Sequence, residues 1–296
     1  MVLDVKGHSG CDINIVNYNK NIAIEKSTNS VSYFDRLKNQ IKKQEHAYSI
    51  LNGKGNIYIP EIYKTTYSDN KVSMIMEYIY SKNFMEYFEY ATKQSIDNLS
   101  KFLTNFIDYE ISNSTLVNVD KSIVINKWNS VKAHIESNEH INKNDKVKQI
   151  VNKCQKIFTM FNESQKQLYL PIGMCHGDLT FSNILFSNDN YYIIDFLDSF
   201  IESPLLDIVK IRQDTKYGWS ALMYTKSYDK IRFDIICKKI DNYIDEYFNQ
   251  TIWYADNYNI FQLMNFLRVI QYAKEDNVIN YLISTINDII NEYEKN

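Results

Sequence analysis

Residues that interrupt or cross-link a chain are scarce in this sequence. Its 296 residues include only seven glycines and three prolines, and there are four cysteines: Cys11, Cys154, Cys175 and Cys237. The cysteines are scattered, and no two of them stand at the spacing of metal ligands. The N-terminal segment contains an acid and no apolar core of signal-peptide length. We therefore expect reduced thiols in a cytoplasmic protein.

Long apolar runs and an excess of one charge are also absent. No stretch of about 18 apolar residues occurs, so the sequence predicts no insertion into a membrane. The 33 basic and 36 acidic residues give a net charge of −3. Since no basic block stands out, nucleic acid is not an expected partner. The sequence gives no indication of the oligomeric state.

The most informative stretch is 174–198, where polar residues alternate with two short apolar runs. Asp178 and Asn183 flank a polar loop, and Asp195 follows the second apolar run. The runs 184–186 and 191–194, separated by the turn 187–190, predict a β-hairpin with a four-residue loop. Such a hairpin brings Asn183 close to Asp195, and an amide oxygen beside a carboxylate suits Mg²⁺. Asp178 is then free to accept a proton.

This motif resembles the catalytic core of the protein-kinase-like superfamily. His176-Gly177-Asp178-Leu179, with Asn183 five residues after Asp178, is similar to the aminoglycoside phosphotransferase and choline kinase branch. The resemblance implies an α+β fold with a small antiparallel-sheet lobe (1–80) and a larger, mainly helical lobe (81–296). It also implies ATP and Mg²⁺ as cofactors, with Asp178 as the catalytic base and Asn183 and Asp195 as metal ligands.

The N-terminal residues predict a lobe that binds the nucleotide. Gly7 and Gly10 allow a tight loop between two short strands, and its N–H groups would face the phosphates. Lys26 ends a predicted strand, and the resemblance makes it the lysine that holds the α- and β-phosphates. The alternatives are that Lys26 is solvated or that Lys20 takes this role. We favour Lys26.

A predicted helix that begins near Phe34 supports this role for Lys26. Apolar residues occupy the inward-facing positions of this helix except one, where Glu45 stands. An acid that is buried in this way requires a partner. We therefore expect Glu45 to pair with Lys26. Strands are predicted at 58–63 and 72–78, and backbone groups near Glu77 and Ile79 would then bind adenine.

The second half of the chain shows helical periodicity, and the acceptor site is expected there. We interpret His176 as a structural residue that holds the loop, and Gly177 as a point where the backbone passes close to another group. Asp207 either supports the site or interacts with a helix N-terminus. Candidates for contact with the acceptor are Asp198, Glu202, Tyr217 and Trp219.

These features predict an enzyme that transfers the γ-phosphoryl group of ATP to a hydroxyl of a small molecule. A sugar, an aminoglycoside-like amine and a choline-like amino alcohol all remain open as acceptors. The alternative is a non-catalytic nucleotide-binding module with the same fold. A protein kinase is disfavoured, because Leu197 replaces the glycine of the D-F-G motif and no A-P-E motif is present.

Overall fold

The computed structural model describes residues 10–295, which form two compact units. The first unit contains the chain up to Phe106, together with His176–Ser199 and Lys226–Ile236. The second contains Ile107–Cys175, Phe200–Thr225 and the chain from Cys237 onward. Both units are therefore built from separate segments, whereas the predicted lobes rest on a single division at residue 80, which stays a prediction.

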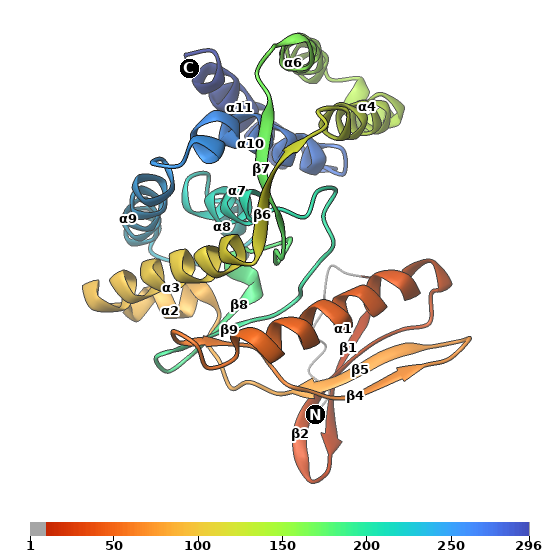
Figure 1. Ribbon diagram of the computed structural model, residues 1–296, viewed down its shortest axis with the longest axis vertical. Helices are drawn as coiled ribbons and strands as arrows, with labels where there is room; N and C mark the ends of the chain where they lie inside the picture. The colour runs from red at the N-terminus through yellow and green to blue at the C-terminus, as the bar shows by residue number, and fades with distance from the viewer. Residues whose placement is uncertain (1–9, 296) are drawn as a thin grey trace. The chain divides into compact units, whose positions relative to one another are not determined.

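The first unit contains an antiparallel sheet with the strand order β1-β2-β5-β4. The strands are β1 (Asp12–Tyr18), β2 (Asn21–Thr28), β4 (Ile62–Tyr67) and β5 (Val72–Glu77). Helix α1 (Val31–Leu51) lies along one face of this sheet (Figure 1). The core between them consists of Phe34, Leu37 and Ile41 on the helix, packed with Cys11 and with strand residues Val72, Met74 and Met76. Burial of this apolar stripe holds the helix on the sheet.

The predicted strand 58–63 is wrong, because the chain divides there into two strands of different sheets. Ile57–Tyr58 forms β3, which pairs in parallel with β9 (Asn190–Ile193), whereas β4 joins the four-stranded sheet. Pro60 lies between them and has no N–H group to donate to a strand partner. The amide of Ile59 instead donates to the side chain of Asn52, which ends α1.

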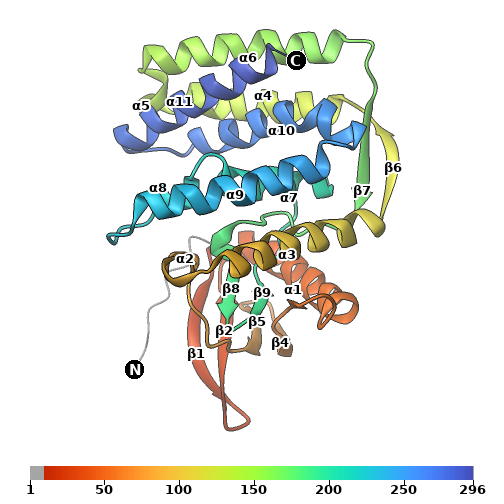
Figure 2. The same ribbon diagram turned by 90° about the vertical axis from the view of Figure 1, so that its left-hand side faces the viewer.

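The predicted hairpin is present in the first unit, with a shorter loop than expected. Strand β8 (Ile184–Ser187) pairs with β9, and Ser187 lies opposite Asn190. The loop is therefore Asn188-Asp189, two residues rather than four. Asn188 adopts a left-handed φ of 52°, which asparagine tolerates well. Helix α2 (Phe84–Tyr90) packs against β8 (Figure 2), and α3 (Lys93–Ser112) follows it.

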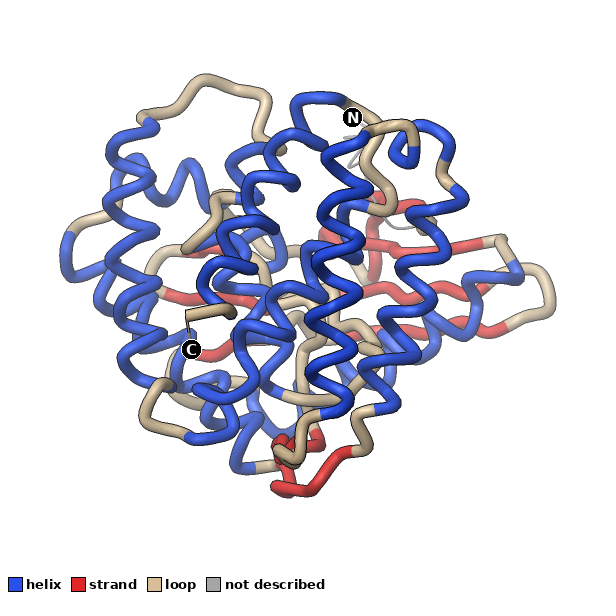
Figure 3. The backbone as a smooth tube through the Cα atoms, turned by 90° about the horizontal axis from the view of Figure 1, so that it is seen from above, coloured by secondary structure: helices blue, strands red, loops and turns tan. Residues whose placement is uncertain are grey.

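The second unit is mainly helical. Figure 3 shows the helices of the whole chain in blue. Its only strands among the described residues are β6 (Ser114–Val119) and β7 (Leu168–Gly173), which pair antiparallel. Most residues of β6 are exposed. Its sequence therefore lacks the alternation of apolar and polar residues that would predict a strand. The helices are α4 (Ser122–Ser137), α5 (Glu139–Asn142), α6 (Asp145–Glu163), α7 (Pro204–Thr215), α8 (Trp219–Leu222), α9 (Lys230–Phe248, which begins in the first unit), α10 (Ile252–Ile270) and α11 (Asp276–Tyr293).

Helices α4, α6, α10 and α11 pack side by side (Figure 2). The helical periodicity predicted for the second half of the chain is confirmed in α11, where Ile279, Leu282, Ile286 and Ile290 are all buried. Within residues 10–295, no helix has both the length and the apolar character that crossing a membrane requires.

A buried arginine connects α7, α9 and α10 in the second unit. The Arg212 side chain is 2% exposed and donates two hydrogen bonds of 2.9 Å to the carboxylate of Asp241. It also pairs with Asp245 and lies over the ring of Tyr258, 4.4 Å from its centroid. A buried guanidinium with this set of partners is costly to disrupt, because the remaining acids stay uncompensated.

We expect Arg212→Met to lower the free energy of unfolding by about 3–5 kcal/mol, because it leaves Asp241 without its counter-ion. Lys166→Met is the matched control, since Lys166 forms an exposed ion pair with Asp256 at 2.7 Å. That pair should contribute less than about 1 kcal/mol. Urea unfolding followed by circular dichroism measures both variants. Equal midpoints for the two variants would contradict the structural role of Arg212.

Candidate active site

His176 is fully buried at the start of the loop 176–183 and fixes two neighbouring segments. Its Nδ1 accepts a hydrogen bond of 3.1 Å from the backbone N–H of Asp178. The proton must then be on Nε2, which donates to the carbonyl oxygen of Ile194 at 2.8 Å. The backbone N–H of Leu197 donates to the carbonyl of His176. The predicted structural role of His176 is therefore confirmed, because the ring joins Asp178 to the residue that precedes Asp195.

Gly177 is the point of closest backbone approach in this loop. Its φ is +87°, and a Cβ atom added there would collide with the carbonyl oxygen of Leu197. The predicted close approach at Gly177 is confirmed. Because no other residue fits this position without a backbone shift, Gly177 fixes the distance between the loop 176–183 and the segment after Asp195.

Asp178 and Asn183 lie in direct contact. The side-chain amide of Asn183 donates to the backbone carbonyl of Asp178 at 2.8 Å and to its carboxylate at 3.1 Å. Asn183 ends a 3₁₀ turn (Phe181–Asn183) directly before β8. With Nδ2 used in this way, its Oδ1 is the atom that remains to bind a cation.

Asp195 lies next to Asn183 because the hairpin brings the two ends of its strands together. The backbone N–H of Ile194 donates to the carbonyl of Asn183 at 3.0 Å. Asp195 adopts a left-handed φ of 63°, and its side chain is 29% exposed. One carboxylate oxygen accepts a hydrogen bond of 2.7 Å from Nζ of Lys26, whose side chain is 1% exposed.

The donor set at this end of the hairpin fits Mg²⁺ that arrives with a nucleotide. The available ligands are the amide oxygen of Asn183 and the accessible carboxylate of Asp195. In the part of the chain that the structure describes, no three His, Cys, Asp or Glu side chains gather into a metal cluster. An ion held here would therefore take its other ligands from phosphate and water, as Mg²⁺ does in nucleotide sites.

The predicted pair between Lys26 and Glu45 is wrong. Glu45 is exposed, and the partner of Lys26 is Asp195. The buried stripe of α1 passes from Ile41 to Gln44, three residues on, instead of to Glu45. The helical period allows a step of three or four, and a glutamine in an apolar stripe is easily overlooked.

The predicted phosphate loop is described only in part. Gly7 lies outside the described residues. Gly10 is exposed and precedes β1, and its carbonyl accepts a hydrogen bond from Thr28 at the end of β2. The neighbouring Cys11 thiol has its pKa raised by burial, with partial compensation from the charge of Lys26. Gly10 is therefore close to the site, and its contact with phosphates stays a prediction.

The predicted adenine segment follows β5. The backbone N–H of Glu77 donates to the carbonyl of Glu61, so it is occupied. Within residues 10–295, the backbone N–H of Ile79 has no such backbone partner. The next residues of the linker bind the hairpin, because Lys82 and Phe186 exchange two backbone hydrogen bonds. Ile79 is therefore the group of this segment best able to bind a ligand.

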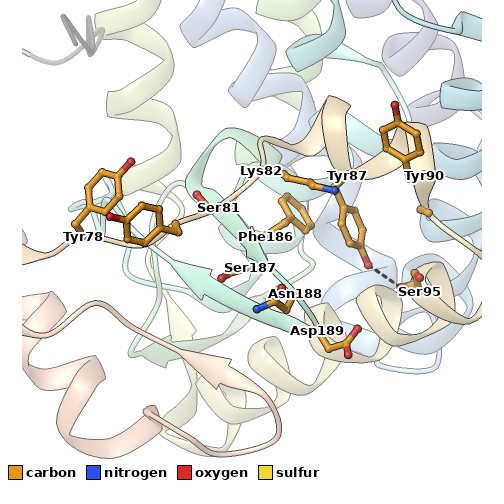
Figure 4. A pocket seen from close by; sticks show the side chains of 12 residues that line it. Tyr78, Ser81, Lys82, Tyr87, Tyr90, Ser95, Phe186, Ser187, Asn188 and Asp189 are labelled. Atoms are coloured by element: carbon orange, nitrogen blue, oxygen red, sulfur yellow. Dashed lines mark hydrogen bonds between the residues drawn. The ribbon is translucent and has the colours of Figure 1, made fainter. Parts of the chain in front are cut away.

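A pocket of about 480 Å³ lies at the turn end of the hairpin, within the first unit (Figure 4). Its walls include Tyr78 and Lys82 from the linker, Tyr87 from α2 and Asp189 from the turn. Asn183 and Asp195 are at the other end of the hairpin, and a strand of four residues spans about 13 Å. The pocket is therefore separate from Asn183 and Asp195.

The candidate acceptor residues belong to different units. Asp198, in the first unit, accepts a hydrogen bond of 2.7 Å from Asn39. In the second unit, the Glu202 carboxylate accepts from the Cys175 thiol, and Trp219 lies beside Tyr281. Their contact with an acceptor stays a prediction.

Two further residues of the second unit are more buried than a contact role suggests. The ring of Tyr217 packs against Phe266, and burial raises the pKa of its hydroxyl. Asp207 is completely buried at the start of α7. A role of Tyr217 or Asp207 in binding the acceptor or supporting the site stays a prediction.

Comparisons with known proteins agree with this geometry. Residues 133–224 match the model of a family described as "Phosphotransferase enzyme family". The chain is 27% identical over 112 residues to Protein LicA of Haemophilus influenzae, a match that covers 35% of this chain and 40% of LicA. The matched region thus spans less than half the length of that relative.

Solved structures match over nearly the whole chain. A thermostable mutant of aminoglycoside phosphotransferase APH(4)-Ia superposes with a TM-score of 0.64 at 9% identity, covering 99% of this chain and 94% of the other. The chain has a protein-kinase-like fold. Two further structures share this fold. Glucosamine kinase has a TM-score of 0.59 at 11% identity, covering 94% of this chain and 75% of the other. The streptomycin–ATP–APH(2")-IIa complex has a TM-score of 0.54 at 15% identity, covering 97% of this chain and 91% of the other. The predicted fold class and the resemblance to phosphotransferases are confirmed.

We expect Gly177→Ala to destabilise the kinase-like fold strongly, because the added methyl group meets a backbone oxygen. Gly53→Ala is the matched control: its φ is +80°, but nothing lies within 4 Å of the added Cβ. The control should cost only the left-handed strain of about 1–2 kcal/mol. Thermal unfolding of both variants measures the difference. Equal unfolding temperatures would contradict the close approach at Leu197.

Proposed function

We propose that the protein transfers the γ-phosphoryl group of ATP to a hydroxyl of a small molecule. The observation that carries the proposal is the arrangement at the open end of the hairpin. There, Asp178 contacts Asn183, and Asp195 contacts the buried Lys26. A proton acceptor, two oxygen ligands and a cation are the groups that phosphoryl transfer requires.

In this mechanism Asp178 orients the acceptor hydroxyl and takes its proton as the oxygen–phosphorus bond forms. Asn183 helps to hold the Asp178 carboxylate through the 3.1 Å hydrogen bond to one of its oxygens. The backbone of Asp178 is also held by His176, so the base starts from one fixed orientation. Positioning of this kind supplies much of the rate enhancement in phosphoryl transfer.

Asn183 and Asp195 would hold Mg²⁺, which neutralises charge on the phosphates when it is bound. Lys26 would bind the α- and β-phosphates, and the loop that contains Gly7 and Gly10 would cover them. The backbone N–H of Ile79, with the carbonyl of Glu77, would bind the adenine edge. Support comes from the amide of Ile79, which has no backbone partner within residues 10–295, and from neighbours whose structures contain ADP or ATP.

The acceptor we favour carries both a hydroxyl and an amine. Hygromycin B and streptomycin occupy two of the similar structures, and a third is a glucosamine kinase. Acids that would suit a cationic amine are Asp198 and Glu202. We place the reaction in the cytoplasm, where ATP is available and the four buried cysteines remain as free thiols.

A nucleotide-binding module without catalysis is the second candidate. The observation in its favour is the missing Lys26–Glu45 pair, because a lysine that lacks this partner is a feature of a degenerate site. The intact Asp178–Asn183 contact argues for catalysis. The two candidates differ in one measurable property, the transfer of phosphate to an acceptor.

We expect Asp178→Asn to lower phosphoryl transfer by about 10²–10⁴-fold, because the amide cannot accept the hydroxyl proton. Binding of Mg²⁺·ATP should be retained, since Asp178 is not a phosphate ligand. Asp189→Asn, at the exposed hairpin turn, is the matched control and should keep full activity. Mass spectrometry of a metabolite extract measures transfer, and calorimetry measures binding. A product from Asp178→Asn at the rate of the unaltered protein would exclude Asp178 as the base.

A further inference from the structure

Gln40 is a buried glutamine in α1 that no other group in the described protein satisfies. Its side chain is 3% exposed, and neither Oε1 nor Nε2 has a hydrogen-bond partner among the described atoms. Leaving a buried amide unpaired costs stability, so such groups are rare and often have a functional reason. Gln44, one turn further along α1, is buried to the same degree but donates to the carbonyl of Pro60.

The neighbours of Gln40 on the helix show where its side chain lies. Leu37, three residues before it, packs in the core between α1 and the sheet, together with Cys11 and Met74. Lys43, three residues after it, donates to the carbonyl of Leu197. Residues three apart lie on the same side of a helix, so Gln40 lies between the sheet and the segment that follows Asp195.

The ion pair of Lys26 and Asp195 also lies between the sheet and the segment that follows Asp195. Lys26 lies opposite Met74 in the sheet, so both side chains are on the face that α1 covers. Its ammonium group extends from this face to Asp195, two residues before Leu197. The buried Gln40 side chain is therefore on the helix face that covers the sheet face carrying Lys26.

The hydrogen-bonding needs of the two side chains are complementary. The Lys26 ammonium has three donors, and within residues 10–295 its one hydrogen-bond acceptor is Asp195. Gln40 has an unused acceptor oxygen. The carboxylate oxygen that Lys26 uses is also on the residue expected to ligate Mg²⁺. Metal ligation weakens the attraction between Asp195 and Lys26, because it places a second cation on the same carboxylate.

We propose that Gln40 is the positioning residue for Lys26: its Oε1 accepts a hydrogen bond from the ammonium group when Asp195 ligates the metal. This inference rests on the proposed nucleotide site. Gln40 thus takes the place that the sequence pattern assigned to Glu45. Because Gln40 is neutral, Asp195 is, of these two residues, the single counter-ion of Lys26. Lys26 is therefore held by Asp195 without metal and by Gln40 with it.

The test compares the affinity for ATP with and without Mg²⁺, measured by calorimetry on the full chain and on Gln40→Met. Methionine has the volume of glutamine but offers no strong acceptor. With Mg²⁺ the variant should bind ATP about tenfold more weakly, as expected for a lost hydrogen bond to a charged group. Without Mg²⁺ the two proteins should bind ATP alike, because Lys26 then stays with Asp195.

Gln44→Met is the matched control, and thermal unfolding without ligand is the second readout. Gln40→Met removes an unpaired amide and should unfold at the same temperature as the unaltered chain or above it. Gln44→Met loses a hydrogen bond to Pro60, so it should unfold lower and keep the normal effect of Mg²⁺. If Gln40→Met bound Mg²⁺·ATP as tightly as the unaltered chain does, the inference would be overturned but the proposed function would stand. The same holds if the unfolding temperature of Gln40→Met fell like that of Gln44→Met. Failure of the unaltered chain to bind Mg²⁺·ATP would overturn the proposed function with it.

Discussion

The ion pair between Lys26 and Asp195 is the contact that connects the four-stranded sheet to the β8–β9 hairpin. The lysine is almost fully buried, and a buried ammonium group is stable only when a carboxylate compensates it. The two residues are 169 positions apart in the sequence, so the pair forms only when the hairpin has docked beside β2. Correct folding of the first unit and correct placement of the expected metal ligand are therefore the same event.

Two features of the loop 176–183 keep this arrangement in one geometry. The ring of His176 joins the amide of Asp178 to the carbonyl of Ile194, and Gly177 lets the loop approach Leu197. Asp178 and Asp195, the proposed base and metal ligand, are thus connected through backbone groups, which move less than long side chains. This rigidity is what a reaction governed by positioning requires.

Local patterns predicted the hairpin well, whereas contacts between distant segments limited the prediction. The spacing of Asp178, Asn183 and Asp195 around two apolar runs was sufficient to predict the hairpin. The expected pair with Glu45 was wrong because a one-residue error in the phase of α1 placed Glu45 in the buried stripe, where Gln44 lies. The partner of Lys26, Asp195, is 169 positions away in the sequence. Strand β3 was missed for a related reason: Ile57–Tyr58 pairs with β9, a segment more than a hundred residues away. Such pairing leaves no trace in the local sequence.

The measurement that tests the central claim most directly uses ATP labelled with ¹⁸O in the γ-phosphoryl group. The protein is incubated with Mg²⁺, the labelled ATP and a metabolite extract that contains amino sugars and amino alcohols, and products are identified by mass spectrometry. The account predicts a phosphorylated small molecule that carries the labelled phosphoryl oxygens, with an equal amount of ADP. Binding of Mg²⁺·ATP without any labelled product would contradict catalysis and favour a nucleotide-binding module.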